Sequence, residues 1–402
     1  MNTPRQVIIV GAGPVGLSAA LFLVERGIAV TVLERAPALV EDMRASTFHP
    51  STLDMLAPRG VAARLVGEGH RAQRWQFLRL DTGEAAVFDL DVLAGETAHP
   101  FRLQCEQFRL TRAIVECLRD EPLFRIQFGA ELVDFQDDGA GVRVHLRTAE
   151  GERRLDALFL VGADGASSAT RRLLGMELAG ATYPKTSITV VVDFPFEDHL
   201  RDMLFVNYVW TASDHYSLMR ISQHWRTGFS PADGQSLEDA VALPNVRQHL
   251  ARILPAAADA TVVHVGAYTI QRRLVERFRV GRVLLTGDAA HLNSPAGGMG
   301  MNSGIHDARS LARALAEVLH GGDEAALDRY AAVRRQIAQD DVQVQSDRNY
   351  RRHREKDPQQ REIIWRDLRE VTADPARMRA YLLESSMIAS VKRSEQAEGV
   401  QA

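Results

Sequence analysis

The sequence predicts an α/β fold, in which a parallel sheet with covering helices carries an inserted antiparallel sheet and a set of C-terminal helices. Three segments predict the parallel part: Val10–Arg35, Gly162–Arg172 and Gly287–Ala308. Each follows or continues a short apolar run and contains a glycine turn before a helical pattern, as strand–turn–helix units do. The insertion is predicted at 184–275, where apolar and polar residues alternate as in antiparallel strands.

The first segment has the features of a dinucleotide-binding unit. An apolar strand at 7–10 leads into Gly11, Gly13 and Gly16, and then into a helix. Glycine permits the tight turn, close approach of backbone to a pyrophosphate and close helix–strand packing, while the helix N-terminus attracts phosphate oxygens. The next strand ends at Glu34, where a carboxylate accepts hydrogen bonds from a ribose diol. This pattern predicts a Rossmann-like site, but it does not distinguish FAD from NAD.

The other two segments place acidic turns at the ends of predicted strands. Asp164 and Asp288 each follow an apolar run, and ligands bind outside the carboxyl ends of parallel strands. Asp288 is suited to accept a hydrogen bond from a sugar or ribityl hydroxyl. The glycines at 297–300 allow a flat ring to lie against backbone, and the helix that follows directs its positive dipole end at an anionic reduced flavin. The three segments together favour FAD.

These residues resemble the motifs of the group A flavoprotein monooxygenases, the aromatic hydroxylase family with the para-hydroxybenzoate hydroxylase fold. The resemblance covers roughly residues 5–320 and is carried by GxGxxG, DGxxSxxR and GDAAHxxxPxxGxGxNxGxxDA. It implies a Rossmann-like FAD-binding domain with cofactor contacts from Gly11, Gly13, Gly16, Glu34, Arg35, Arg44, Gln107, Asp164, Asp288, Pro295, Gly298, Gly300, Met301 and Asn302. Within this set it puts Glu34 at the adenosine ribose, Arg44 near the pyrophosphate and Asp288 at the ribityl chain.

The resemblance also implies a reaction. NADH or NADPH reduces the flavin, and one atom of O2 is inserted, through a flavin C4a-hydroperoxide, into an electron-rich aromatic or heteroaromatic ring bearing a hydroxyl or amino group. Pro295 is expected to line the reaction cavity, and His291 to orient its loop rather than act as a general base. Candidate substrate contacts on the inserted sheet are Tyr208, His215, Tyr216, Arg220 and His224. The strand period puts His215 on one face and Tyr216 and Arg220 on the other, so at most one set faces the flavin.

Two other functions remain open at this point. A flavin-dependent reductase or dehydrogenase of the same fold would act on a non-aromatic substrate and would need a more apolar cavity than this sheet indicates. A non-catalytic FAD- or nucleotide-binding protein is expected to have lost one of the motifs, whereas all three are intact.

Composition agrees with an enzyme of this kind. A chain of 402 residues, of which 46% are hydrophobic, can bury a large core, and a net charge of −4 offers no electrostatic reason to bind nucleic acid. Cys105 and Cys117 lack metal-ligand spacing and are expected to be buried thiols in a reducing compartment. No signal-like or membrane-spanning segment is recognisable, so we expect a cytoplasmic protein without a bound metal.

The predicted organisation alternates between the two sheets. The FAD-binding domain is expected at 1–73, 102–180 and 276–320, the substrate domain at 74–101 and 181–275, and C-terminal helices at 321–402. The tail has mixed charge with interspersed apolar residues, which favours helices that pack an apolar stripe on the core. A homodimer contact through the same residues is the alternative.

Overall fold

The computed structural model describes residues 7–41, 43, 45–211, 214–232 and 234–400. One end of the molecule is a six-stranded sheet in the order β18-β19-β12-β1-β2-β8, parallel except for the edge strand β18. Its strands are β1 (Val7–Val10), β2 (Val30–Glu34), β8 (Phe124–Phe128), β12 (Phe159–Gly162), β18 (Arg279–Val280) and β19 (Val283–Leu285). The inner strands are buried along their length, which explains their nearly continuous apolar sequences.

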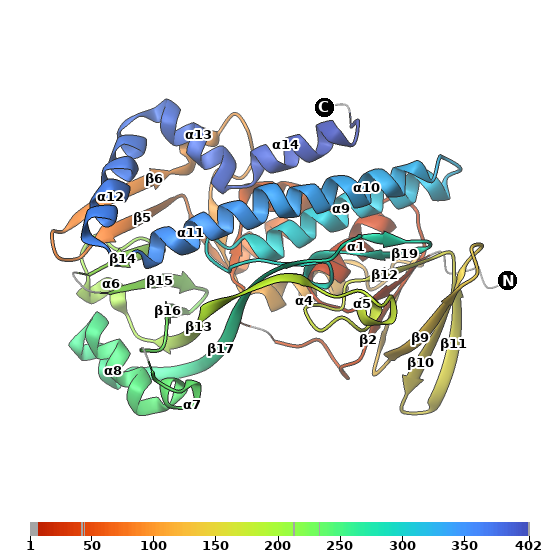
Figure 1. Ribbon diagram of the computed structural model, residues 1–402, viewed down its shortest axis with the longest axis horizontal. Helices are drawn as coiled ribbons and strands as arrows, with labels where there is room; N and C mark the ends of the chain where they lie inside the picture. Colours follow the sequence, from red (N-terminus) through yellow and green to blue (C-terminus); the bar gives the residue numbers. More distant parts are fainter. Residues whose placement is uncertain (1–6, 42, 44, 212–213, 233, 401–402) are drawn as a thin grey trace.

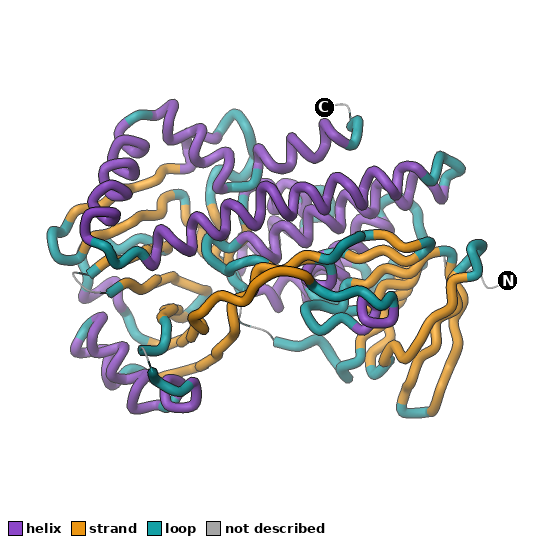
Figure 2. Tube along the Cα trace, viewed as in Figure 1, coloured by secondary structure: helices purple, strands orange, loops and turns teal. Residues whose placement is uncertain are grey.

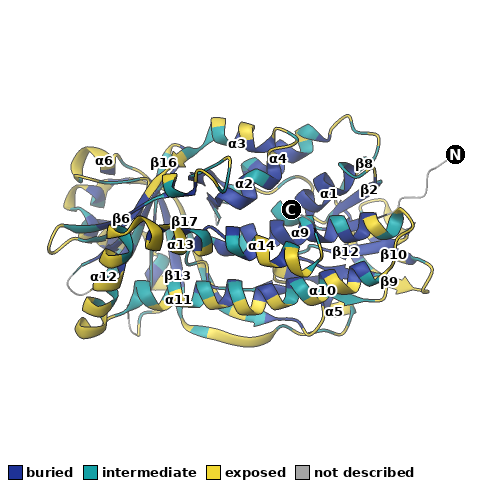
Figure 3. Ribbon diagram, turned by 90° about the horizontal axis from the view of Figure 1, so that it is seen from above, coloured by how far each residue is buried: buried dark blue, intermediate teal, exposed yellow. Residues whose placement is uncertain are grey.

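Helices pack over this sheet and complete its core. Helices α1 (Pro14–Val24), α4 (Gln107–Cys117) and α9 (Met299–Leu319) contribute many of the apolar side chains of this core, and Figure 3 shows α9 largely buried between its neighbours. A three-stranded sheet extends from the same end of the molecule (Figure 1). It is formed by β9 (Glu131–Asp137), β10 (Val142–Thr148) and β11 (Gly151–Ala157). The predicted strands before the Asp164 turn are therefore present.

The other end is built on an eight-stranded sheet in the order β20-β17-β13-β16-β15-β14-β5-β6. Its strands are β5 (Arg74–Arg79), β6 (Glu84–Asp89), β13 (Ala179–Asp193), β14 (Val206–Trp210), β15 (His215–Ile221), β16 (His224–Phe229), β17 (Thr261–Leu274) and β20 (His291–Leu292). The long strands β13 and β17 run from one end of the molecule to the other (Figure 1). One face of the sheet packs on α7 (Leu237–Val241), α8 (Leu243–Ile253) and a 3-10 helix at Pro255–Asp259, so its other face is available for a site.

Short elements join the two ends. A small sheet contains β3 (Thr47–Phe48), β7 (Arg102–Gln104) and β4 (His70–Ala72), and α2 (Pro50–Leu56) and α3 (Val61–Glu68) lie next to it in the chain. The other short helices are α5 (Ala169–Leu173), after β12, and α6 (Phe196–His199), after β13. Two further 3-10 helices lie at Leu90–Leu93 and Gly287–Ala289. Cys105 follows β7 and is buried, which raises the pKa of its thiol to about 12, whereas Cys117 is only half-buried; both are free.

The C-terminal region starts with one long helical rod. It consists of α10 (Ala325–Ile337), a π-helical segment at Ala338–Gln343 and α11 (Val344–Arg354), and it runs from the six-stranded sheet to the eight-stranded one (Figures 1 and 2). Helices α12 (Pro358–Ala373), α13 (Pro375–Ser385) and α14 (Ile388–Ala397) follow. Trp365, Leu368, Met378 and Leu382 pack with side chains of β5 and β6. The apolar residues of the tail therefore pack on the core of the same chain, as the favoured sequence interpretation expects. A homodimer contact through the tail stays a prediction.

None of the described helices combines the length and apolar character needed to cross a membrane. Within the same residues, no group of three or more histidine, cysteine and acidic side chains is arranged to hold a metal ion.

Candidate cofactor and substrate cavity

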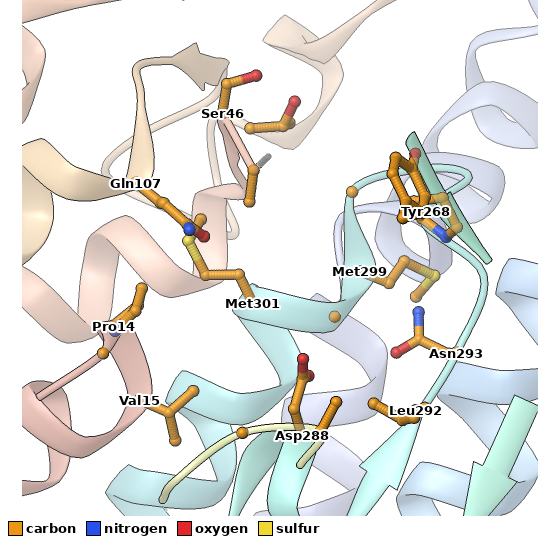
Figure 4. A pocket seen from close by; sticks show the side chains of 18 of the residues that line it. Pro14, Val15, Ser46, Gln107, Tyr268, Asp288, Leu292, Asn293, Met299 and Met301 are labelled. Atoms are coloured by element: carbon orange, nitrogen blue, oxygen red, sulfur yellow. The ribbon is translucent and has the colours of Figure 1, made fainter. Parts of the chain in front are cut away.

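A cavity of about 870 Å³ extends from the turn between β1 and α1 to the inner face of the eight-stranded sheet. This volume lies toward the upper end of the range for small-molecule sites. The acidic residues that line it, Glu34, Glu131, Asp164 and Asp288, all belong to the end with the parallel sheet. Figure 4 shows the middle of the cavity, where Asp288 points inward and Gln107 and Met301 point toward each other.

Glycine is present at three positions of the first turn, and the structural reason for it differs from one position to the next. Gly11 has a φ of 104°, and a Cβ there would lie 2.5 Å from the carbonyl oxygen of Ala163. A Cβ at Gly16 would lie 2.0 Å from the carbonyl oxygen of Gly11. Gly13 has an ordinary φ of −74°, and within the described residues a Cβ there would meet nothing inside 4 Å. The fold therefore needs Gly11 and Gly16, whereas the bare backbone at Gly13 leaves space for a ligand.

The first turn also presents hydrogen-bonding groups to that space. Gly13 is the N-cap of α1 and provides no side-chain cap, so the N–H groups of the first helical turn are available to an anion. The Glu34 carboxylate accepts hydrogen bonds from the N–H groups of Ala12 and Ala36, both at 2.9 Å. These bonds hold the carboxylate at the cavity wall, and a carboxylate has further lone pairs with which to accept from a ribose.

Asp164 organises the loop in which it lies. Its carboxylate accepts hydrogen bonds from the Ser168 hydroxyl at 2.5 Å and from the N–H and hydroxyl of Thr170 at 2.9 and 3.0 Å. Arg171 donates to the carbonyl groups of Ala166 and Ala289, at 2.8 and 3.1 Å, and so ties this loop to the one that carries Asp288. The Asp164 side chain lines the cavity, but it is engaged in shaping the loop.

A buried ionic cluster packs against the loop that carries Asp288 and holds it in place. Asp307 accepts from Arg334 Nε and from His291 Nε2, each at 2.7 Å, and all three residues are fully buried or nearly so. Burial alone would raise the pKa of Asp307, but the charge of Arg334 and the hydrogen bonds from His291 and Arg334 outweigh it and lower the pKa to about 2. His291 does not line the cavity. Its contacts agree with the expected role in orienting the loop.

The glycine-rich loop before α9 is held by two buried residues. Gly298 caps α9 with a φ of 69° and leaves the first turn without a side-chain cap. Asn302 donates to the carbonyl groups of Gly298 and Thr47 at 2.7 and 2.8 Å. His49 donates from Nε2 to the Gly297 carbonyl at 2.8 Å, and burial lowers its pKa to about 3, so the ring is neutral. The loop is thus fixed from the side opposite the cavity.

Most predicted cofactor contacts line the cavity, namely Gly11, Gly13, Glu34, Arg35, Gln107, Asp164, Asp288, Pro295, Gly298, Gly300 and Met301. Gly16 and Asn302 are not among the residues that line it, and their contact with the ligand stays a prediction. Gly16 is required for packing, and the Asn302 amide is used by the loop. Arg44 lies outside the described residues.

Of the predicted catalytic residues, Pro295 and His215 line the cavity. Tyr216 and Arg220 do not line it, because strand parity puts both on the opposite face of the sheet, which packs against α7 and α8. Tyr216 is buried in that core, and Arg220 lies over the Trp225 ring, 3.9 Å from Glu197. Tyr208 lines the cavity, and His224 does not.

The inner face of the eight-stranded sheet and the C-terminal helices enclose a chamber. The residues that line it at alternate strand positions include Trp75, Phe77, Tyr208, His215, Ser217, Met219, Arg226, Gly228 and Tyr268. The rod and α13 add Asn349, Tyr350, His353, Arg354, Tyr381 and Ser385. We refer to these residues, together with Arg102 of β7, as the chamber.

Two neutral histidines meet in the chamber. The rings of His215 and His353 lie edge to face with their centroids 4.9 Å apart, and His353 Nε2 donates to the Tyr216 carbonyl at 3.3 Å. Burial lowers the pKa of His215 to about 3, assisted by the charges of Arg354 and Lys356, and it lowers the pKa of His353 strongly. Neither ring is protonated at neutral pH.

Sequence reasoning missed Arg102, Arg226, Tyr268 and His353. Arg226 and Tyr268 occupy alternate strand positions on the chamber face, so strand parity could have identified them once one inward residue was known. Arg102 and His353 come from elements outside the sheet, and no local pattern indicates their position.

Comparison with known proteins agrees with this geometry. The chain matches the family described as FAD binding domain over residues 5–345. It is 31% identical over 391 residues to para-nitrophenol 4-monooxygenase of Pseudomonas sp. strain WBC-3, covering 96% of both chains. It is 30% identical to the 6-hydroxy-3-succinoylpyridine 3-monooxygenase HspB of Pseudomonas putida S16, covering 94% of this chain and 97% of that protein. The crystal structure of p-nitrophenol 4-monooxygenase PnpA from Pseudomonas putida DLL-E4 superposes with a TM-score of 0.90 at 28% identity, over 97% and 99% of the chains.

Proposed function

The chain belongs to the FAD binding domain family as a group A flavin-dependent aromatic monooxygenase, and from this premise we propose that it hydroxylates an electron-rich aromatic ring, with NADH or NADPH as electron donor and O2 as oxygen source. The observation that carries the proposal is the continuity of the cavity. Dinucleotide-binding features line one end, aromatic and polar side chains line the other, and the N-terminus of α9 lies between them. A reductase acting on a lipid-like substrate is not favoured, because charged and polar side chains line the chamber.

The residues present fit an FAD molecule in this cavity. The open space at Gly13 and the N-terminus of α1 suit the pyrophosphate, Glu34 suits the adenosine ribose, and Asp288 suits the ribityl chain. The N-terminus of α9 suits the negatively charged edge of a reduced flavin ring. When bound, the flavin supplies the redox chemistry that accepts a hydride and activates oxygen.

The chamber residues are suited to position the substrate and to bind its ring hydroxyl. His215 is neutral, so it can accept a hydrogen bond from a ring hydroxyl, but its low pKa means that it holds a proton poorly. His215 is therefore suited to orient a ring hydroxyl by accepting its hydrogen bond and not to hold its proton. Pro295 lines the cavity shortly before Gly298, the cap of α9.

Replacing Asp288 by alanine is expected to weaken FAD retention, because a buried ribityl hydroxyl loses its acceptor. The loss of about 1–3 kcal/mol for such a bond corresponds to a roughly 5- to 150-fold rise in the FAD dissociation constant. Flavin fluorescence titration of the apoprotein measures it. Asp288→Asn keeps an acceptor oxygen and should lose less, and an unchanged dissociation constant in Asp288→Ala would remove Asp288 from the site.

The function is tested by mixing FAD-loaded protein with NADH or NADPH in a stopped-flow instrument, across a panel of hydroxylated and aminated aromatic compounds. We expect one compound to accelerate flavin bleaching and then, with O2, to yield a product heavier by one oxygen atom. Slow bleaching with every compound, peroxide as the only oxygen product, and turnover of an alkene under anaerobic conditions would together support the reductase instead.

A further inference from the structure

Three methionine side chains line the cavity, namely Met219, Met299 and Met301. Cys105 and Cys117 do not line it, so the sulfur atoms among the described residues of its wall are all thioethers. A thioether is oxidised to a sulfoxide, which turns a flexible apolar side chain into a polar one. The reaction proposed above assigns no chemical role to these three sulfur atoms.

Two of the three methionines are engaged in contacts within the wall. The sulfur of Met219 accepts a hydrogen bond from Arg226 at 3.4 Å, and the residue is 8% exposed. Met299 is 2% exposed and packs with Val342 of the π-helical segment and with Met387. Contacts of this kind shield both sulfur atoms from a small molecule in the cavity.

Met301 differs from both. It is half-buried, and no hydrogen bond within the described residues uses its sulfur. Figure 4 shows its side chain extending from the first turn of α9 into the middle of the cavity, toward Gln107. Because the same helix start suits the edge of the flavin ring, the Met301 thioether lies in the part of the cavity that the reactive ring would occupy.

We propose that Met301 is the site at which hydrogen peroxide formed in the cavity oxidises this protein. A reduced flavin that passes its electrons to O2, without giving an oxygen atom to a substrate, releases hydrogen peroxide. The inference rests on the proposed function only in placing FAD in this cavity. It does not require the hydroxylation of any substrate.

The oxidation is a two-electron transfer from sulfur to peroxide. A lone pair of the Met301 sulfur forms a bond to one peroxide oxygen, and the O–O bond breaks. The departing hydroxide takes the proton from the oxygen now bound to sulfur and leaves as water. Sulfur is thereby oxidised to the sulfoxide, and a methionine sulfoxide reductase restores the thioether.

The modification depends on turnover without a suitable substrate. When a ring accepts one atom of O2, the other atom leaves as water and no peroxide forms. When no ring accepts it, peroxide forms beside Met301 in each cycle of reduction and reoxidation. The sulfoxide at Met301 therefore accumulates with the number of unproductive cycles.

The experiment cycles the flavin without a nicotinamide or an aromatic compound. FAD-loaded protein is reduced under nitrogen by light and EDTA, exposed to air in the dark, and taken through this cycle repeatedly in the presence of catalase. Catalase removes peroxide that reaches the solution, so only oxidation inside the protein remains. Peptide mass spectrometry locates each added oxygen atom. We expect Met301 sulfoxide to rise with the number of cycles and to exceed the sulfoxide at Met176 and Met203 several-fold.

Met176 and Met203 are matched references, because both are half-buried as Met301 is, but neither lines the cavity. A second sample receives hydrogen peroxide from the solution, without reduction of the flavin and without catalase. Oxidation there should follow access from the surface, and the preference for Met301 over these two residues should fall. The same distribution of sulfoxide in both samples, or cycling that leaves Met301 unmodified, would overturn the proposal.

Leucine variants assign the oxidation to one sulfur atom. Met301→Leu removes the thioether and keeps an apolar side chain, and cycling should then add no oxygen to the cavity wall. Met219→Leu is the control and should leave the yield of Met301 sulfoxide in each cycle unchanged. The flavin spectrum of each variant is recorded first, so that yields are compared per bound flavin. More sulfoxide at Met219 or Met299 than at Met301 in the wild type would contradict the assignment.

This inference and the monooxygenase function can fail separately. Selective oxidation of Met301 in a protein that hydroxylates no aromatic compound would support the inference and overturn the proposed function. Hydroxylation of a ring, together with flavin cycling that leaves Met301 unmodified, would do the reverse. A protein that binds no FAD would overturn both.

Discussion

Replacing Gly13 by valine is expected to give a folded protein that purifies without flavin. The Gly13 backbone is extended, so valine fits its conformation, and the described protein atoms leave its Cβ direction empty. The isopropyl group would fill the space that the pyrophosphate needs next to the α1 N-terminus, and overlap of this kind removes binding rather than weakening it slightly. The ratio of the visible flavin absorbance to the ultraviolet absorbance of the polypeptide measures the flavin content of the purified protein.

Gly16→Val separates cofactor loss from misfolding. Its Cβ would lie 2.0 Å from a backbone oxygen, so this variant is expected to lose stability and folded yield. Circular dichroism melting distinguishes the two outcomes. A yellow Gly13→Val protein with a normal flavin spectrum would show that the phosphates lie elsewhere.

Replacing Asp307 by alanine is expected to produce the largest loss of stability. The carboxylate is completely buried and bonds to both Arg334 and His291, and Arg334 is only 1% exposed. Removing it leaves a buried guanidinium without its counter-charge, which costs roughly 3–5 kcal/mol in comparable cases. Urea unfolding measures the change. Asp328→Ala, which removes one of the exposed acidic partners of Arg279 and leaves Glu324, is the control and should change stability by no more than about 0.5 kcal/mol.

The same cluster has a defined dependence on pH. The pKa of Asp307 falls from 3.8 to about 2 on folding, so its stabilising effect is complete above the unfolded value and is lost as the pH falls through the folded one. The stability difference between the wild type and Asp307→Ala should therefore stay constant down to about pH 4 and shrink below it. A difference that grows on acidification would contradict the ionised state of Asp307.

The parallel half of the fold could be predicted because its determinants are local. A buried strand, a glycine that must adopt positive φ at position 11 and a helix start form one short continuous segment, and an acid at a strand end has a fixed place in such a sheet. Most of the residues of these turns that the family resemblance implies as cofactor contacts line the cavity. At Asn302 the motif does not show that the side-chain amide donates to the carbonyl groups of Gly298 and of Thr47, the second of which is far away in the sequence.

The substrate half could be predicted only in part. Alternation along β15 showed that His215 and Tyr216 face opposite ways, but it could not show which face α8 covers. That choice depends on packing between segments far apart in the chain. The same limit applies to His353 and Tyr381, which reach the chamber through the rod and α13.

The rod has a consequence for how such an enzyme diversifies. The family match ends at residue 345, yet Asn349, His353, Arg354 and Tyr381 beyond it form part of the chamber wall. Mutations in this tail can alter which ring is accepted while the glycine turn and the Asp288 loop stay as they are. One side of the chamber wall thus lies on a stretch of the chain separate from the cofactor turns, while the sheet side of the same wall is interleaved with those turns in the sequence.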